Sequence, residues 1–392
     1  MSEFDEFAEA LFGQLDVELS EEKEIARLAE EAPHNDAFDD IKDLCDRMQP
    51  EMAGRAADLL GLRQNPDVRI EYPELHDLKM VKGRKVFCPS ESRSFVEGLF
   101  GAVAAEDRGG VVDAMRADPA KYLVYSTYAI QYISKITTTY GDYLDGTIFV
   151  NRFVLSRYPD IILHKMGGGP VGQVRSGYVG AAKMTILEES VHSIQEPLQR
   201  ANRLAAAEVN TINEKLAGIV LDMDEGSVKE LSDYLQLQAV PDDFPFARKA
   251  NLFFFLNPDH FLTGQIGPDV MTYTHVEVDP AIERHLPELS DTYMEWLSPI
   301  QRHHAAFSVM EGMAGYAVHH ILGDDPDFAQ YSATFSGSGA GSYQTRKDMG
   351  RDFVEHAGGE MGAGAFRTMI ESPPTTTELK DPPRYVRRFA SL

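Results

Sequence analysis

The stretch that decides the fold reads Met184-Thr-Ile-Leu-Glu-Glu-Ser-Val-His-Ser-Ile-Gln-Glu-Pro-Leu198. Its apolar residues recur at intervals of three and four, which predicts a helix with one buried face. Glu188 and His192 are four residues apart beside that face, so a helix presents both side chains in one direction on successive turns. This is the spacing at which a helix offers two ligands to one metal ion.

The pattern Glu188-Glu-Ser-Val-His192 differs by one residue from the H-E-x-x-H motif. In zinc hydrolases with that motif, two histidines bind the ion and the intervening glutamate is the general base for metal-bound water. Here Glu188 stands at the first ligand position, Glu189 at the base position and His192 at the second ligand position. Since a carboxylate is a harder ligand than imidazole, we expect zinc or, alternatively, manganese or iron as the cofactor.

A third ligand is expected on a second helix, in the segment around Glu311. Glu311 lies beside an apolar stripe of predicted core residues, and a carboxylate in that position is costly to bury unless it is paired or metal-bound. Gly312 is placed to let this helix approach another closely. His304, about two turns earlier, and Tyr316 are candidates for stabilising a transition state or a ligand of the metal.

Four segments, in this order, resemble a known family. Residues 186–195 resemble the H-E-x-x-H-A-x-Q helix of a zincin-like family of metal-dependent hydrolases, which some genomes label as associated with coenzyme F420 biosynthesis. Residues 309–316 resemble its L-x-E-G-x-A-x-Y segment, residues 350–354 its G-x-x-F-V segment, and residues 371–382 its closing E-S-P signature. The resemblance implies a mainly helical zincin fold with a small sheet.

Carried over residue by residue, the resemblance implies Glu188, His192 and Glu311 as metal ligands and Glu189 as the catalytic base. The departure from the family's pattern is Glu188, which stands where the family has histidine.

The composition is that of a globular protein, with 43% hydrophobic and 25% charged residues. The formal net charge of -25 repels phosphate backbones, so we expect no nucleic-acid partner. The sequence contains no apolar run of about 18 residues and no secretory signal, so we predict a cytoplasmic protein without membrane insertion. Two cysteines, Cys45 and Cys88, are too few for a disulfide framework.

The expected fold class is mainly α (α+β), with a helical N-terminal region over residues 1–115 and a zincin-like metal-site domain over residues 116–392, or one continuous domain. Two short β-rich runs, 147–151 and 161–164, predict strands of a small sheet. Residues 72–91 indicate loops and short strands.

A glycine-rich run, Gly167-Gly-Gly-Pro-Val-Gly172, matches G-x-G-x-x-G. A dinucleotide site needs that loop to open a helix within a βαβ unit. Pro170 and the further glycines up to Gly180 favour a flexible loop instead, so no organic cofactor is predicted.

The leading hypothesis is a hydrolase of peptide or amide bonds in a peptide or small-molecule substrate. Glu189 would take a proton from the metal-bound water as that water attacks. Three alternatives stay open. In the first, Glu188 and Glu189 belong to a solvated helix face and His192 is a hydrogen-bonded core histidine. A ferritin-like iron site also uses an E-x-x-H pair such as Glu189 and His192, but it needs a second pair that the sequence lacks. A zincin scaffold that has lost catalysis, a pseudoenzyme serving as a binding or structural module, is favoured by Glu188. The oligomeric state is not indicated.

Overall fold

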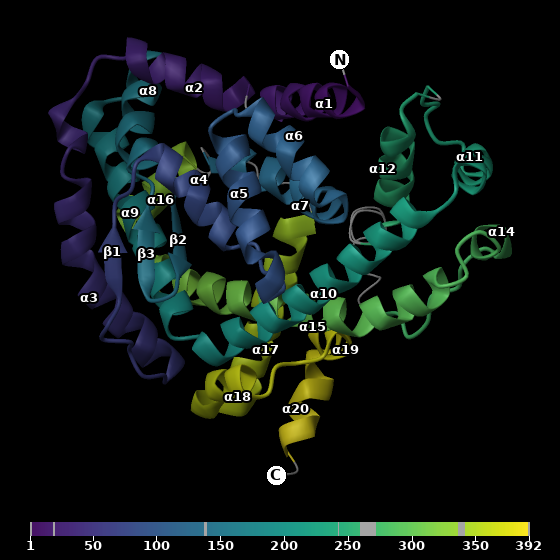
Figure 1. Ribbon diagram of the computed structural model, residues 1–392. Helices are drawn as coiled ribbons and strands as arrows, with labels where there is room; N and C mark the ends of the chain where they lie inside the picture. Colours follow the sequence, from purple (N-terminus) through teal and green to yellow (C-terminus); the bar gives the residue numbers. More distant parts are fainter. Residues whose placement is uncertain are drawn as a thin grey trace. The chain divides into compact units, whose positions relative to one another are not determined.

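The structure is a computed structural model that describes residues 2–18, 20–136, 139–241, 243–258, 272–335 and 342–390. It is mainly helical with a small three-stranded sheet, which confirms the predicted class (Figure 1). None of the helices in these ranges is long and apolar enough to cross a membrane.

The chain divides into two compact units, each assembled from three separate segments. Unit 1 comprises Met1–Glu18, Lys79–Ser134 and Asn202–His303, and unit 2 comprises Leu19–Leu78, Lys135–Ala201 and His304–Leu392. The division at residue 115 expected from the sequence stays a prediction.

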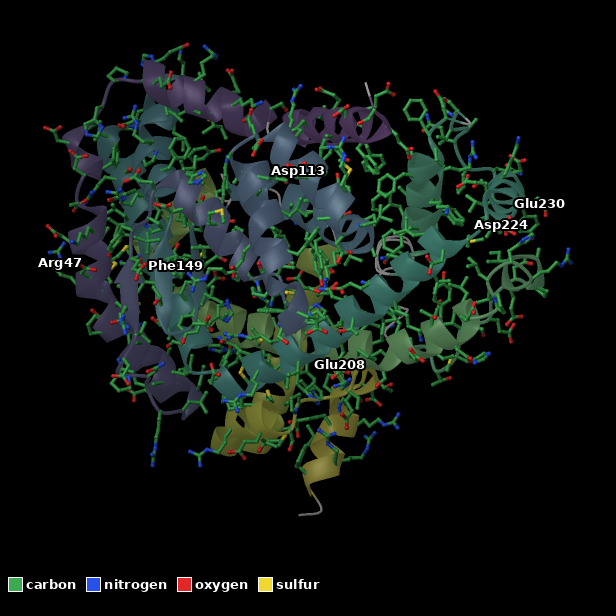
Figure 2. The ribbon with its side chains drawn as sticks, viewed as in Figure 1. Arg47, Asp113, Phe149, Glu208, Asp224 and Glu230 are labelled. Atoms are coloured by element: carbon green, nitrogen blue, oxygen red, sulfur yellow. The ribbon has the colours of Figure 1, made fainter. Side chains whose placement is uncertain are left out.

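Unit 1 is helical. It contains α1 (Glu3–Glu18), α5 (Arg93–Ala104), α6 (Arg108–Ala117), α7 (Pro119–Ser134), α11 (Glu225–Tyr234), α12 (Pro245–Leu256), α14 (Pro280–Glu283), most of α4 (Leu75–Arg84) and α10 (Glu196–Asp222), and the first part of α15 (Leu289–Leu322). Trp296 is fully buried against Val209 and Ile300. Acidic side chains such as Asp113 and Glu230 are exposed to solvent, as the net charge predicts (Figure 2).

Unit 2 contains the sheet, whose strands are β1 (Arg69–Glu71), β2 (Gly141–Leu144) and β3 (Thr147–Val150) in the order β1-β3-β2. β1 pairs with β3 in parallel, and β2 pairs with β3 as an antiparallel hairpin. The turn between β2 and β3 consists of Asp145 and Gly146. Both have positive φ, 48° and 83°, as a two-residue type I′ turn requires. The predicted strand at 147–151 is confirmed, and Phe149 on it is buried (Figure 2).

Two predictions on either side of this hairpin are wrong. Residues 161–164 belong to the helix α8 (Tyr158–His164), which Pro159 starts in its first turn. Three apolar residues followed by a histidine fit a buried helix as well as a strand, so the run alone does not distinguish them. Residues 72–91 were expected to form loops and short strands, but they include α4, whose Leu78 and Val81 are buried at helical spacing.

The helix α9 (Val171–Ser193) carries the predicted motif, but it begins well before Met184. Most of the glycine-rich segment expected to be a loop is therefore helical. Gly180 in this segment allows α16 (Pro326–Thr334) to pack closely on α9. A Cβ at this position would lie 2.1 Å from the carbonyl oxygen of Asp327 in α16, which is too close for any side chain. Lys183 reinforces this contact, because its Nζ lies 2.6 Å from Asp325 and 2.9 Å from Asp327.

Around α9, unit 2 gathers its largest core. The contributing helices include α3 (Ile41–Leu60), the second part of α15, α17 (Ser342–Met361), α18 (Ala365–Glu371), α19 (Thr376–Lys380) and α20 (Pro382–Ala390). Ile186 and Leu187 of α9, Met313 of α15 and Phe353 of α17 are fully buried there. A smaller cluster joins α2 (Ser20–Glu31) to α8 through Ile25 and Ile161.

An ion pair ties α9 to the start of α3. The Nη1 and Nη2 atoms of Arg175 lie 2.6 and 2.5 Å from the two carboxylate oxygens of Asp40, and the Tyr178 hydroxyl donates to the same group at 3.2 Å. The Arg175 guanidinium holds the pKa of Asp40 below its usual value.

We expect Arg175→Gln to lower the free energy of unfolding by about 1 kcal/mol at neutral pH, since the pair is only partly buried. An Asp with a depressed folded-state pKa stabilises the fold above its unfolded pKa of about 3.9 and loses that contribution as the pH falls through the folded value. Urea unfolding from pH 7 down to pH 3 should therefore show the difference between variant and wild type shrinking in acid. Arg200→Gln, which removes an exposed 3.8 Å contact with Glu196, is the control.

Candidate metal-ligand site and its lysine

The two motif residues of α9 point away from the core, as their spacing predicts. The side chains of Glu188 and His192 are 21% and 13% exposed, whereas Leu187 and Val191 between and beside them are fully buried. The helix thus presents a carboxylate and an imidazole together on one partly accessible face.

A close crossing of α15 and α17 brings the remaining groups to this face. A Cβ on Gly312 would lie 2.3 Å from the carbonyl carbon of Gly350, and a Cβ on Gly350 would lie 1.8 Å from the carbonyl oxygen of Ser308. The two backbones therefore touch, which only glycine permits at these positions. The crossing sets Glu311 of α15 beside Lys347, one turn before Gly350 on α17.

Lys347 joins the predicted ligands. Its Nζ lies 3.3 Å from an oxygen of Glu188 and 3.3 Å from an oxygen of Glu311. The other oxygen of Glu311 lies 3.7 Å from Nε2 of His192. The three residues predicted as metal ligands therefore meet at one place, and the ammonium group of Lys347 bridges the two carboxylates.

As the side chains are placed here, their ligand atoms do not converge as those of a zinc site do. Zinc binds carboxylate oxygen and imidazole nitrogen at about 2.0–2.2 Å, so its ligand atoms converge closely. Among the described residues, the group of three or more His, Cys, Asp or Glu side chains whose ligand atoms all lie within 4.8 Å of one another is a different one, His34 with Asp36 and Asp39. The carboxylates of Glu188 and Glu311 are instead arranged around a lysine, which supplies one positive charge without a metal.

The charged groups of the site affect the pKa of a neighbouring tyrosine, Tyr331. Burial raises the pKa of Tyr331 to about 12, the charge of Glu188 adds to the rise, and the charge of Lys347 opposes it. Tyr331 packs edge to face on Tyr140, with ring centroids 5.8 Å apart. A buried tyrosine, Tyr331, and a partly buried one, Tyr140, therefore lie close to one another on the Glu188 side of the site.

The other predicted functional residues have contacts of their own. Glu189 is 8% exposed and faces the sheet, where a Cβ on Gly141 of β2 would lie 3.4 Å from its Cγ. His304 is buried, and its Nδ1 lies 3.2 Å from Nη1 of Arg346. Tyr316 packs on the ring of His320 at 4.1 Å.

Two residues of this site were not predicted. Lys347 gives no local signal, because its partners are 159 and 36 residues away along the chain. The one feature that pointed to the region is that Lys347 lies three residues before Gly350, where the segment that resembles a family motif begins. Gln195 follows the motif by three residues and bonds His192, a contact that the motif's spacing could have suggested.

The His34 cluster is exposed and already has charge partners. Nε2 of His34 lies 2.7 Å from Asp39, and its Nδ1 lies 3.1 Å from the guanidinium of Arg157, which itself pairs with the buried Asp160. The hydrogen bond to Asp39 raises the pKa of His34. Both ring nitrogens are engaged within the protein, so we assign no metal to this cluster.

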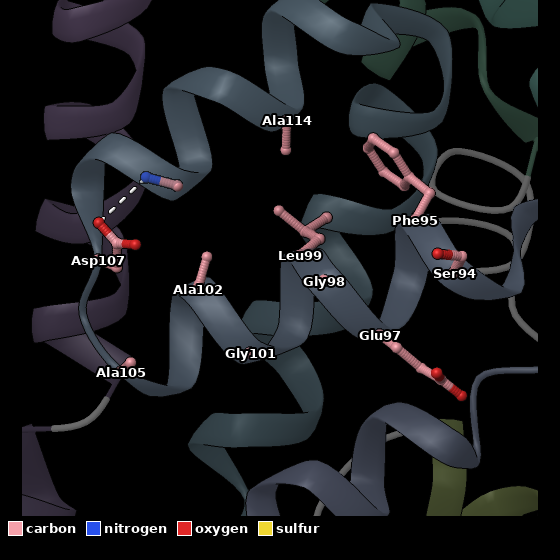
Figure 3. A pocket seen from close by; sticks show the side chains of 11 residues that line it. Ser94, Phe95, Glu97, Gly98, Leu99, Gly101, Ala102, Ala105, Asp107 and Ala114 are labelled. Atoms are coloured by element: carbon pink, nitrogen blue, oxygen red, sulfur yellow. Dashed lines mark hydrogen bonds between the residues drawn. The ribbon is translucent and has the colours of Figure 1, made fainter.

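A separate cavity of about 420 Å³ lies in unit 1 between α5 and α6 (Figure 3). Small residues such as Gly98, Ala102 and Ala114 form most of its wall. Of its acidic residues, Asp107 caps α6 by accepting a hydrogen bond from the Gly110 N–H at 3.0 Å (Figure 3). The residues that line it include no histidine or cysteine.

Comparison with known proteins adds no relationship: no protein-family profile, curated protein or solved structure matches the chain. Membership of the zincin-like family therefore stays a prediction that rests on the four sequence segments.

Proposed function

We propose that this chain is a zincin-like protein without metal-dependent hydrolytic activity, which serves as a binding or structural module. The observation that supports the proposal is the bridge from Lys347 to Glu188 and Glu311. The ammonium group takes the place that a divalent ion would have between those carboxylates.

An ammonium group does not do the chemistry of a metal in this place. A hydrolytic metal ion lowers the pKa of a bound water and polarises the bond to be cleaved. A lysine held between two carboxylates offsets one of their two negative charges and holds α9 and α17 to α15. Glu188 in place of histidine agrees with this role, because a second carboxylate gives the ammonium group a second anionic partner.

The metal-dependent hydrolase predicted from the sequence is the second candidate. The convergence of Glu188, His192 and Glu311 favours it, since these three would hold zinc, manganese or iron if Lys347 withdrew. Glu189 would then be the base.

The metal content of purified protein separates the two functions. Wild type, Lys347→Ala and the double variant Lys347→Ala/Glu188→His are each loaded with zinc, manganese or iron, dialysed and analysed for bound metal. We expect no stoichiometric metal in wild type and one zinc ion per chain in the double variant, whose His, His and Glu ligands are those of a thermolysin-type site.

Controls make the result specific. Adding Glu311→Ala to the double variant should abolish zinc uptake, and Lys229→Ala, at an exposed lysine of unit 1, should behave as wild type. Stoichiometric metal in wild type, together with chelator-sensitive peptide hydrolysis that Glu189→Gln abolishes, would overturn the proposal in favour of the hydrolase.

A further inference from the structure

Gln195 connects the two elements that form the site. It lies just beyond the C-terminal end of α9, and its side chain is fully buried. Its Nε2 donates to the carbonyl oxygen of Met310 at 3.1 Å, and its Oε1 lies 3.0 Å from Nδ1 of His192. Met310 directly precedes Glu311, so one amide group spans the histidine and the carboxylate segment.

The chemistry of these partners determines the orientation of the amide. A carbonyl oxygen only accepts hydrogen bonds, so the NH₂ group of Gln195 must face Met310. Its Oε1, which also only accepts, then faces Nδ1 of His192. That nitrogen must carry a proton for the second bond to form.

A proton on Nδ1 leaves the lone pair of a neutral imidazole on Nε2. Nε2 is the nitrogen 3.7 Å from Glu311, on the side of the site. Gln199 holds the same residue through its backbone, since its Nε2 donates to the His192 carbonyl oxygen at 2.5 Å. Gln195 thus orients the imidazole ring of His192, and Gln199 holds the backbone of the same residue.

We propose that Gln195 is a positioning residue that keeps His192 in the Nδ1–H tautomer and directs Nε2 into the site. Buried carbonyl and carboxylate groups play this part for histidines that bind metals. Here the buried side-chain amide of Gln195 orients the histidine, and it also connects the histidine to the helix that carries Glu311. The inference goes beyond the proposed function, because it rests on the contacts of Gln195 with His192 and Met310 and not on the bridge from Lys347.

Nuclear magnetic resonance of protein with ¹⁵N-labelled histidine rings tests this directly. After treatment with a chelator, the His192 ring signals, assigned as those missing in His192→Gln, should show a protonated Nδ1 and an unprotonated Nε2 in wild type. In Gln195→Leu, which removes both hydrogen bonds, the signals should shift to the Nε2–H tautomer. Gln199→Leu, which removes a bond to the backbone only, should keep the wild-type tautomer.

Two results would overturn the inference: an Nε2–H tautomer in wild type, or an unchanged Nδ1–H tautomer in folded Gln195→Leu. If Gln195→Leu does not fold, the wild-type spectrum alone decides, together with Gln195→Glu, whose carboxylate accepts from Nδ1–H and should keep that proton in place. The outcome is separate from that of the metal analysis. Stoichiometric metal in wild type would end the proposed function, yet the chelated protein would still report the tautomer.

Discussion

Gly350→Ala should destabilise unit 2 by about 3 kcal/mol, at the upper end of the cost of overpacking. The added methyl group would lie 1.8 Å from the carbonyl oxygen of Ser308, and that oxygen belongs to the backbone of α15. Relief therefore requires α15 and α17 to move apart, which separates Lys347 from Glu311. Chemical unfolding should show a large drop in the midpoint.

Two matched glycines serve as controls for this substitution. A Cβ added to Gly359, on the same helix, would have no atom within 4 Å, and one added to Gly315 on α15 would meet only a side-chain carbon at 4.0 Å. Alanine at either position should leave stability unchanged or raise it by up to about 1 kcal/mol, because alanine is the better helix former. Equal stability of Gly350→Ala and Gly359→Ala would contradict the close crossing.

Lys347→Met should destabilise the protein by about 2 kcal/mol in the presence of a chelator. This value lies between those of exposed ion pairs and of fully buried ones, since the three side chains are 12–23% exposed. Without the ammonium group, Glu188 and Glu311 face each other as two partly buried carboxylates. Adding Glu188→Gln to Lys347→Met should restore part of the stability, and a double-mutant cycle measures the coupling.

The same stability measurements are repeated with excess zinc. A ligand that binds only the folded state stabilises it in proportion to the logarithm of its concentration above the dissociation constant. Excess zinc should therefore stabilise Lys347→Met and leave wild type unchanged. Lys229→Met is the matched control and should change nothing. If Lys347→Met left the free energy of unfolding unchanged, Lys347 would not compensate the charges of Glu188 and Glu311.

Local features of the fold followed from the sequence. The helix through Glu188 and His192 and the strand at 147–151 are present, since each depends on the periodicity or β propensity of neighbouring residues. The errors occurred where local patterns are ambiguous. The three apolar residues at 161–163 suit either a strand or a helix, and the glycines after Gly172 suit either a loop or a helix packed closely on another.

The sequence by itself determined that Glu188 and His192 share one face of a helix, because a helix places residues four apart on the same side whatever surrounds it. The tertiary structure decided what that face contacts. Lys347 reaches Glu188 and Glu311 only because α15 and α17 touch at Gly312 and Gly350, and no local pattern encodes a contact between helices so distant in the chain. That contact puts a lysine between two of the residues that the motif and its companion segment predicted as metal ligands.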